Sequence, residues 1–448
     1  MRETYIKENI ALVDKIYPSA NLEKHRKMTT SPFVFFRGSA QLYYADIANQ
    51  TIAFPDAFDE IPLTSIVGDC HCSNFGFLTE EGSHGDTVIF SPNDFDDACV
   101  GKAQWDILRF ISSLSLAQQH CNGVILGNYC DDDINMSKQV VDDQSVIRAQ
   151  MAFIDAYTAT CERVTNDSKT IYEAMDNRPD AINSKLSKLY DKAVRRSAGG
   201  IEFLTKSALA KAIAVSNNAL SFKTLPSKFE ALSRDDYKLL HTAFSPYMDD
   251  TIIDIVRRVR SGTGSVNMER YYFLVGPSVP YSSAHISYCH VVEVKQQRCA
   301  APLYFFPDMN PVNALNAAHL TARSQRRMQR KPDLILDSVS FNDSLFLIRS
   351  RHHARVGITP ADIVMGKKAI AGGLSYFAQL CGYTLALAHC RGDRRSTRFA
   401  QKAYPIIAQH KESLINLAKR HVEQVLYDHS LFTELCKNEV TSFNKCTN

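Results

Sequence analysis

The stretch Val67-Gly-Asp-Cys-His-Cys-Ser-Asn-Phe-Gly76 places Asp69 in a turn directly after the apolar run 64–67, and Asn74 follows Asp69 by five residues. Transfer of a phosphoryl group needs a carboxylate that orients the attacking hydroxyl and accepts its proton. It also needs a neutral oxygen ligand that helps to hold a magnesium ion near the phosphates. An aspartate and an asparagine at this spacing meet both needs. The stretch therefore predicts a loop for phosphoryl transfer, with Asp69 as catalytic base and Asn74 as metal ligand.

A second acidic stretch follows downstream, Phe90-Ser-Pro-Asn-Asp-Phe-Asp-Asp-Ala98. Asp94 comes after the predicted strand 87–90, and a carboxylate at the end of a strand can point into a cleft without being buried. Hard cations prefer such oxygen ligands, so Asp94 is the second predicted metal ligand. Asp96 and Asp97 could supply further oxygens, because neighbouring carboxylates repel one another unless a cation neutralises them.

Each acidic stretch also has a purely structural interpretation, since aspartates are common in Asx-turns and helix caps. His71 is a candidate metal ligand or acid, or else a hydrogen-bonded structural residue. Asp106 is better explained as a buried carboxylate that accepts backbone N–H bonds and braces the catalytic loop. Arg37 is a candidate for binding a substrate or phosphate anion, or else pairs with an interior carboxylate.

A glycine-rich stretch, Arg260-Ser-Gly-Thr-Gly-Ser-Val-Asn267, lies far downstream. Gly262 and Gly264, with Ser265, would let the backbone approach a phosphate closely. The later strand His290-Val-Val-Glu-Val-Lys295 carries a lysine among valines, where burial is disfavoured unless the ammonium finds an anion. Lys295 is therefore predicted to bind nucleotide phosphates. The alternative is an edge-strand lysine that prevents aggregation.

The composition is that of an ordinary soluble protein. The 448 residues include 51 basic and 48 acidic side chains, a formal net charge of +3, which gives no strong case for a nucleic-acid partner. The basic cluster at 323–331 predicts a solvated helix face, with an acidic partner or nucleic acid as the alternative. Twelve dispersed cysteines without a Cys-x-x-Cys pair predict reduced thiols in the cytoplasm. No uncharged apolar run approaches the ~18–20 residues of a membrane span, so no membrane contact is expected.

The pattern along the chain predicts an α+β protein. Four parts are expected: 1–130, part of the acidic catalytic lobe; 131–255, helical; 256–350, a β-rich nucleotide-binding lobe; and 351–448, helical again. Expected strands lie at 33–36, 64–67, 87–90, 271–275, 290–295 and 345–349. Expected helices lie at 105–119, 311–330, 361–390 and 395–436.

The chain resembles the uncharacterised, mainly bacterial family called domain of unknown function 2252 (DUF2252). The matching stretches span most of the sequence: Phe36-Arg-Gly-Ser-Ala40, Gly68-Asp-Cys-His-Cys-Ser-Asn-Phe-Gly76, Asn93-Asp-Phe-Asp-Asp97, Gly262-Thr-Gly-Ser-Val266, Val292-Glu-Val-Lys295, Gln325-Arg-Arg-Met-Gln329 and Cys381-Gly-Tyr-Thr-Leu-Ala-Leu-Ala-His389. Its acidic motifs in turn are similar to those of aminoglycoside phosphotransferases and choline kinases.

That resemblance implies a bilobed protein-kinase-like fold with additional helices. The glycine loop and lysine come after the acidic loops, so the implied order is circularly permuted, with the helix that ends at His389 taking a place usually ahead of the catalytic loop. Two positions depart from the pattern: Asn267 stands in place of a third glycine, and Arg323 in place of an acid that would anchor Lys295. The helical stretch 311–330 contains no acidic residue at all.

Together these features predict a phosphotransferase that uses ATP and Mg²⁺ and acts on a hydroxyl of a small molecule or protein. A nucleotide-binding, pseudokinase-like protein without catalysis remains an alternative, as does a nucleotidyl transferase with the same metal ligands. Hydrolase and zinc-protease readings lack support, because no Gly-x-Ser-x-Gly or His-Glu-x-x-His motif occurs.

Overall fold

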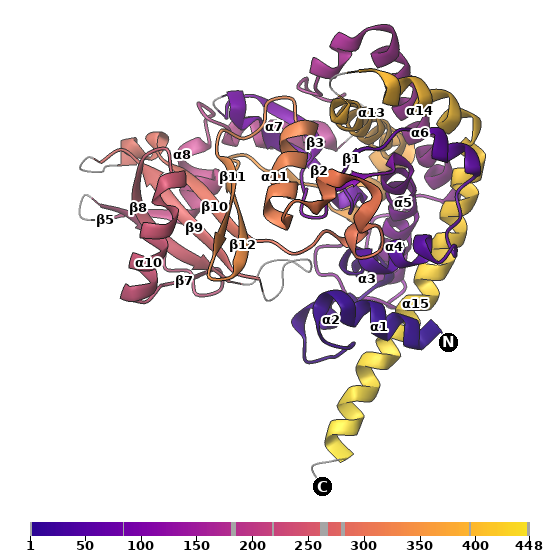
Figure 1. The fold of residues 1–448 in the computed structure, drawn as a ribbon, viewed down its shortest axis with the longest axis horizontal. Coiled ribbons are helices and arrows are strands. Elements are labelled where there is room, and N and C mark those ends of the chain that lie inside the picture. Colours follow the sequence, from indigo (N-terminus) through magenta and orange to yellow (C-terminus); the bar gives the residue numbers. More distant parts are fainter. Residues whose placement is uncertain are drawn as a thin grey trace.

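An antiparallel sheet of six strands and a larger body of helices form opposite ends of the molecule (Figure 1). The computed structural model describes residues 2–445 except 84, 181–184, 217–218, 260–267, 279–282 and 394–395. Within these residues the fold is α+β, as the sequence pattern predicts. The segments that carry the acidic loops lie between the sheet and the helical body (Figure 1).

The six-stranded sheet has the order β11-β12-β10-β9-β8-β7, so β10 is an inner strand. All its neighbouring strands pair antiparallel. The strands are β7 (Phe229–Glu230), β8 (Thr251–Arg258), β9 (Arg270–Gly276), β10 (His290–Gln296), β11 (Leu336–Phe341) and β12 (Ser344–Ser350).

The two faces of this sheet differ because side chains alternate along a strand. On β10, Val292 and Val294 face the helix α10 (Arg234–Phe244) and pack in one apolar cluster with its Phe244. Glu293 and Lys295 therefore belong to the opposite face. The apolar part of that opposite face is covered by the short helices α8 (Phe203–Lys206) and α9 (Ala208–Ala212) and by the hairpin β5 (Ile213–Ser216) and β6 (Ala219–Phe222).

The helical body has a single large apolar core, and α5 is buried along nearly its whole length. Phe110 of α5 stacks on Phe153 of α6 with ring centroids 4.2 Å apart. The longest helix, α15, runs along the outside of the body and ends beyond it (Figure 1). The helices of the body are α1 (Arg2–Asp14), α2 (Glu23–Met28), α3 (Pro32–Gly38), α4 (Ala40–Ala48), α5 (Ala103–Ile125), α6 (Asp143–Asn166), α7 (Leu186–Arg196), α12 (Pro360–Val364), α13 (Leu374–Gly392), α14 (Arg398–Gln409) and α15 (Lys411–Lys445). One further helix, α11 (Ala317–Met328), contacts both α13 and the strands β11 and β12.

Two small antiparallel sheets hold the acidic loops. In one, β1 (Thr64–Ile66) pairs with β4 (Cys99–Gly101); in the other, β2 (Phe75–Thr79) lies between β3 (Val88–Pro92) and β13 (Val356–Gly357). The first acidic loop connects β1 to β2, and the second connects β3 to β4. Both loops therefore lie at ends of strands, as the apolar runs before them predict.

The prediction of a strand at 33–36 is wrong, because these residues belong to α3. Ser31 caps this helix by accepting a hydrogen bond from the Val34 N–H, and Pro32 occupies the first turn, where its missing N–H costs nothing. The run Val-Phe-Phe is apolar because the helix is buried on most of its surface, and a short apolar run alone does not distinguish a strand from a buried helix.

The remaining predicted strands coincide with β1, β3, β9, β10 and β12 to within a few residues. The sheet begins earlier than residue 256, since β7 and most of β8 precede it. The predicted helix 105–119 lies inside α5, and α11 occupies only the second part of 311–330.

One helical stretch, Ala369–Gly392, is long and apolar enough to cross a membrane, but 61% of its most apolar window is buried inside the molecule, as in the core helix of a soluble protein. The ten cysteines from Cys70 to Cys390 are all free thiols, eight of them buried.

Candidate functional site

A cleft of about 1030 Å³, open to solvent, lies where the acidic loops meet the charged face of the six-stranded sheet. Eight basic and five acidic side chains line it, so the cleft carries an excess of positive charge that favours anions. All of the sequence-predicted site residues that the structure describes contribute to the lining. The lining residues are Lys24, Arg37, Gly38, Ala40, Gln41, Val67, Asp69, His71, Asn74, Asp94, Asp96, Asp97, Arg270, Glu293, Lys295, Arg298, Arg349, Arg351 and Arg355.

Asp106 holds the start of the first acidic loop. Its carboxylate accepts hydrogen bonds from the backbone N–H groups of Val67 (2.6 Å) and Gly68 (3.0 Å). The Nε2 atom of His389, from α13, lies 3.1 Å from the same carboxylate, and both side chains are fully buried. These contacts confirm the prediction that Asp106 braces the loop, and they tie the loop to α5 and α13.

Gly68 makes the turn after β1 possible. Its φ of +82° is in the left-handed region, and a Cβ atom there would lie 1.9 Å from the carbonyl oxygen of Asp97. The carbonyl oxygen of Gly68 accepts a hydrogen bond of 2.5 Å from the hydroxyl of Tyr44. The two acidic loops are therefore in direct backbone contact at this glycine.

Asp69, the predicted catalytic base, is held by a buried arginine that sequence reasoning missed. The Nε and Nη2 atoms of Arg109 lie 2.7 and 2.6 Å from Asp69 Oδ1, and Arg109 Nη2 also donates to the Phe36 carbonyl at 2.8 Å. Asp69 Oδ2 lies 3.7 Å from His71 Nε2, which is too far for a hydrogen bond. Arg109 thus fixes the orientation of the carboxylate, and Oδ2 is the oxygen that can accept a hydrogen bond from a molecule in the cleft.

Asn74 is fixed in the same loop. Its side-chain Nδ2 donates to the backbone carbonyl of Asp69 at 2.8 Å, and the backbone carbonyl of Asn74 accepts a hydrogen bond from the Asn93 N–H at 3.0 Å. Because the amide nitrogen is engaged by the main chain, the amide oxygen Oδ1 is the group available to a cation. Asn74 also links the first acidic loop to the segment that leads into Asp94.

Lys295 reaches across the cleft to the second acidic loop, where its ammonium forms an ion pair with Asp96. The lysine is 2% exposed and stands on an inner strand, so the edge-strand interpretation is wrong. Burial opposes the ionisation of Asp96, but the charges of Lys295 and Arg349 outweigh it and lower the pKa of Asp96. The acid that pairs with Lys295 therefore comes from the second acidic loop.

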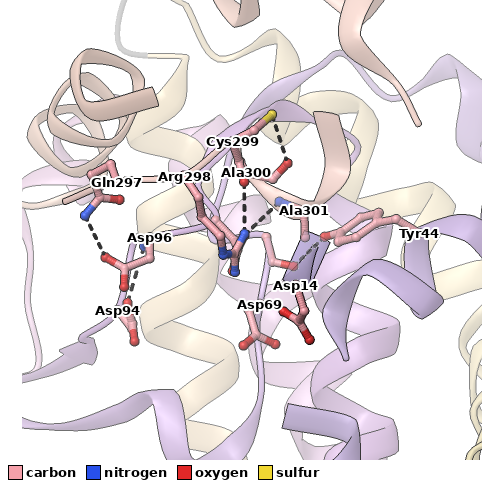
Figure 2. Close-up of polar contacts among 12 residues, drawn as sticks. Asp14, Tyr44, Asp69, Asp94, Asp96, Gln297, Arg298, Cys299, Ala300 and Ala301 are labelled. Carbon is pink, nitrogen blue, oxygen red and sulfur yellow. Dashed lines mark hydrogen bonds and ion pairs between the residues drawn. The ribbon is translucent and has the colours of Figure 1, made fainter. Parts of the chain in front are cut away.

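Asp94 has the opposite electrostatic situation. Its Oδ1 accepts a 3.3 Å hydrogen bond from the Asp96 N–H, and the side chains of Asp69 and Asp94 point the same way from their two loops (Figure 2). Burial raises the pKa of Asp94, and the neighbouring Asp96 carboxylate raises it further. A cation beside Asp94 would oppose both effects, because an opposite charge favours the ionised carboxylate.

Asp97 is a structural residue of the cleft. Arg298 clamps it with two hydrogen bonds, Nη1 to Oδ1 at 2.7 Å and Nη2 to Oδ2 at 2.9 Å, and the Ala301 N–H donates to Oδ1 at 2.7 Å. Figure 2 shows Arg298 and Ala301 close together in the segment that follows β10. This bidentate pair fastens the sheet to the second acidic loop.

A charged cluster on the cleft face of the sheet also escaped sequence reasoning. Glu293 lies between Arg349, whose Nη2 is 2.8 Å from Oε2, and Arg270, whose Nη1 is 3.4 Å from Oε1. Burial opposes ionisation of Glu293, but the two guanidinium groups lower its pKa well below the usual range. The two arginines that pair with Glu293 come from β9 and β12, through a strand register that the sequence does not reveal.

The glycine-rich loop with Gly262, Gly264 and Ser265 lies outside the described residues. The strands on either side of it, β8 and β9, pair with each other in the sheet that carries Lys295. Arg323 of α11 is not among the residues that line the cleft.

No group of three His, Cys, Asp or Glu side chains within the described ranges is arranged to hold a metal ion. Mg²⁺ is commonly bound through one or two carboxylates with waters and substrate phosphates completing its shell. Asn74 and Asp94 could supply the protein's part of such a shell.

Comparison with known proteins places the whole cleft within one family match. Neither a curated protein nor a solved structure matches the chain. A family model described as "uncharacterized protein conserved in bacteria" matches residues 17–128 and 134–435, a range that includes every residue of the cleft. The chain therefore belongs to the DUF2252 family.

Proposed function

We propose that the chain is an ATP- and magnesium-dependent phosphotransferase acting on a hydroxyl of a small molecule or protein. One observation carries the proposal. A lysine buried on an inner strand pairs with the second acidic loop in a cleft with excess positive charge, and the first acidic loop, with Asp69 and Asn74, lines the same cleft. Phosphoryl transfer depends on positioning and on charge neutralisation, for which this set of groups is suited.

In this proposal the charged face of the sheet binds the triphosphate. Lys295 and the arginines at 270 and 349 offer several cationic donors on one surface. Arginine and lysine are the usual protein ligands of phosphate oxygens, arginine through its planar pair of donors. The connection between β8 and β9 is then the glycine-rich loop expected to close over the phosphates.

The acidic loops would provide the remaining parts. Asn74 Oδ1 and the Asp94 carboxylate would hold magnesium, which would supply charge neutralisation at the phosphates. Asp69 Oδ2 would accept the proton of the acceptor hydroxyl as the hydroxyl oxygen bonds to the γ-phosphorus. The bond between that phosphorus and the bridging oxygen breaks, so the products are a phosphate ester and ADP.

The proposed fold is a bilobed protein-kinase-like one in circularly permuted order. The sheet with α10 corresponds to the small lobe and the helical body to the large lobe. Permutation leaves such a site workable, because the geometry of the assembled residues decides the chemistry and not their order along the chain. The free thiols suit a cytoplasmic enzyme, where ATP is available.

The test follows label from γ-labelled and α-labelled ATP in a metabolite extract incubated with the protein. We expect transfer from the γ position only. Asp69→Asn should lower the rate by about two to four orders of magnitude, in line with the contribution of a positioned acid–base group. Asp94→Asn should also lower the rate strongly, because it removes a carboxylate ligand of the magnesium ion. Asp155→Asn is the control, because this exposed carboxylate pairs with Lys411 outside the cleft.

Unchanged transfer in both cleft variants would refute the proposal. Transfer from the α position instead would identify a nucleotidyl transferase with the same metal ligands. A nucleotide-binding protein without transfer is favoured by one observation, the direct ion pair of Lys295 with Asp96, which engages groups that phosphates and a cation would need. Thermal stabilisation by ATP with Mg²⁺, without any labelled product, would establish that function.

A further inference from the structure

One end of the cleft has hydrogen-bond donors that the protein leaves unused. Arg37, at the end of α3, and Gln41, in α4, line the cleft together with Asp69 and His71. Three atoms of this group are buried and have no hydrogen-bond partner: Arg37 Nε, Gln41 Nε2 and His71 Nδ1. Gln41 and His71 are each 2% exposed.

Such unpaired atoms are costly. A buried donor without a partner costs about 1–3 kcal/mol, and most buried side-chain polar atoms in proteins are paired. The nearby Asp69 carboxylate does not relieve them, since it forms no hydrogen bond with any of the three atoms. A ligand that accepts hydrogen bonds at this place would remove the cost.

The unused atoms define the chemistry of that ligand. A guanidinium and a primary amide together present donors that suit a carboxylate or phosphate group. Burial, followed by the charges of Arg37 and Arg109, lowers the pKa of His71 well below its usual range, so its ring is neutral. The ring therefore adds no third positive charge but keeps a nitrogen that can accept a hydrogen bond, such as one from a hydroxyl.

We propose that Arg37 and Gln41 bind an anionic oxygen group, carboxylate or phosphate, of the acceptor whose hydroxyl is presented to Asp69. The acceptor is accordingly a hydroxylated acid or a hydroxylated phosphate ester. This inference rests on the proposed function for the identity of the reacting hydroxyl. The anion subsite itself stands on the unpaired buried donors alone.

The subsite is separate from the groups assigned to the nucleotide. Arg37 and Gln41 come from α3 and α4 of the helical body, whereas Lys295 comes from β10 of the sheet. Variants on the two sides should therefore affect different ligands.

The experiment measures binding of three small probes to the full chain without nucleotide, by calorimetry and thermal shift. Glycerate has hydroxyls beside a carboxylate, glycerol 3-phosphate has hydroxyls beside a phosphate, and glycerol has hydroxyls alone. We expect at least one charged probe to bind and glycerol not to. The charged probe that binds more tightly shows whether the subsite prefers a carboxylate or a phosphate group.

Two variants locate the binding. Arg37→Gln should lower the affinity for the charged probe about tenfold or more, because it removes a charge-assisted hydrogen bond. Gln41→Met keeps the length of the side chain but removes its donors, so it should lower the affinity for the charged probe. Because the removed donor has no partner in the protein, thermal stability without the probe should be unchanged or higher. The second variant keeps the test decisive if the first does not fold.

Lys295→Met serves as the opposite control, and it should lose stabilisation by ATP with Mg²⁺ but keep the charged probe. The inference would be overturned if the charged probes bound no better than glycerol. It would also be overturned if they bound to Arg37→Gln and Gln41→Met as tightly as to the unmodified chain. Loss of probe binding in Lys295→Met but not in Arg37→Gln would assign the anion site to the sheet, and would also overturn the inference. Absence of ATP binding, with the Arg37 dependence retained, would refute the proposed function and leave the subsite standing.

Discussion

Replacing Asp106 with asparagine should destabilise the whole molecule by about 4 kcal/mol. The buried carboxylate accepts two backbone N–H bonds, at 2.6 and 3.0 Å, and pairs with His389 at 3.1 Å. Each hydrogen bond to a charged group contributes about 1.5–3 kcal/mol, and breaking a buried charged network costs about 3–5 kcal/mol in total. Asparagine has nearly the same shape, so the loss reflects charge and hydrogen bonding and not a cavity.

The only tryptophan of the chain makes the measurement local. Trp105 precedes Asp106 on α5 and is 2% exposed, so its fluorescence in urea reports on this part of the core. The control is Asp191→Asn, which removes an ion pair of similar length with Arg178 at the surface (2.7 Å) and should cost less than about 1 kcal/mol.

The free energy of unfolding comes from the urea midpoint and slope of each variant. A loss in Asp106→Asn no larger than in the surface control would refute the reasoning, because it would mean that the loop does not depend on this carboxylate. Agreement of fluorescence with circular dichroism is needed in a chain of this length, since two-state unfolding is not assured.

Two further predictions concern residues around the same core. Gly68→Ala should cost at least about 3 kcal/mol, because it combines a left-handed φ with a Cβ 1.9 Å from the Asp97 carbonyl oxygen, whereas Gly127→Ala, with φ +77° and open space, should cost only about 1–2 kcal/mol. Equal losses of urea stability in the two alanine variants would contradict the close backbone contact. Burial, aided by the charge of Arg109, lowers the pKa of His421 to about 3, so this histidine contributes stability above pH 6.5 that is lost as the pH falls towards 3. Below pH 6.5 the free energy of unfolding of the unmodified chain should fall by about 1.4 kcal/mol per pH unit relative to that of His421→Leu. Between pH 7 and pH 5 the variant should therefore gain about 2 kcal/mol over the unmodified chain. The same difference in urea stability at both pH values would contradict this prediction.

The sequence predicted the parts of the site that depend on local chain direction. Apolar runs followed by Gly-Asp or Asn-Asp located both acidic loops at ends of strands, and Asp106, next to Trp105, was interpreted as a buried brace of the first loop. The same helix had a signal for Arg109 that was not used. Residues three apart on a helix share a face, so a helix that presents Asp106 to the loop also presents Arg109 to it.

The parts that could not be predicted depend on pairings across long distances in sequence. Arg298 meets Asp97 and Arg349 meets Glu293 only after the sheet has its register and the loops are packed against it. The sequence pattern gives the period of a strand but not its neighbours. The prediction of a strand at 33–36 failed for a related reason, since burial of most of the helix surface removes the periodicity that separates helix from strand.

The electrostatics of the second acidic loop make one demand on the proposed function. Two carboxylates stand side by side. Asp96 forms an ion pair with Lys295, whereas the pKa of Asp94 is raised by burial and by that neighbour, even though nearby cations such as Lys295 and Arg355 act to lower it. Phosphates that draw Lys295 away from Asp96 would remove the direct ion pair of this loop and leave the two carboxylates with only the nearby arginines to offset their charges, which is unfavourable unless a cation arrives with the phosphates. On this reasoning ATP should stabilise the protein much more in the presence of a divalent ion than with a chelator. ATP that binds equally well under both conditions would have to contact other cations of the cleft, and Lys295 would then be a structural partner of Asp96 alone.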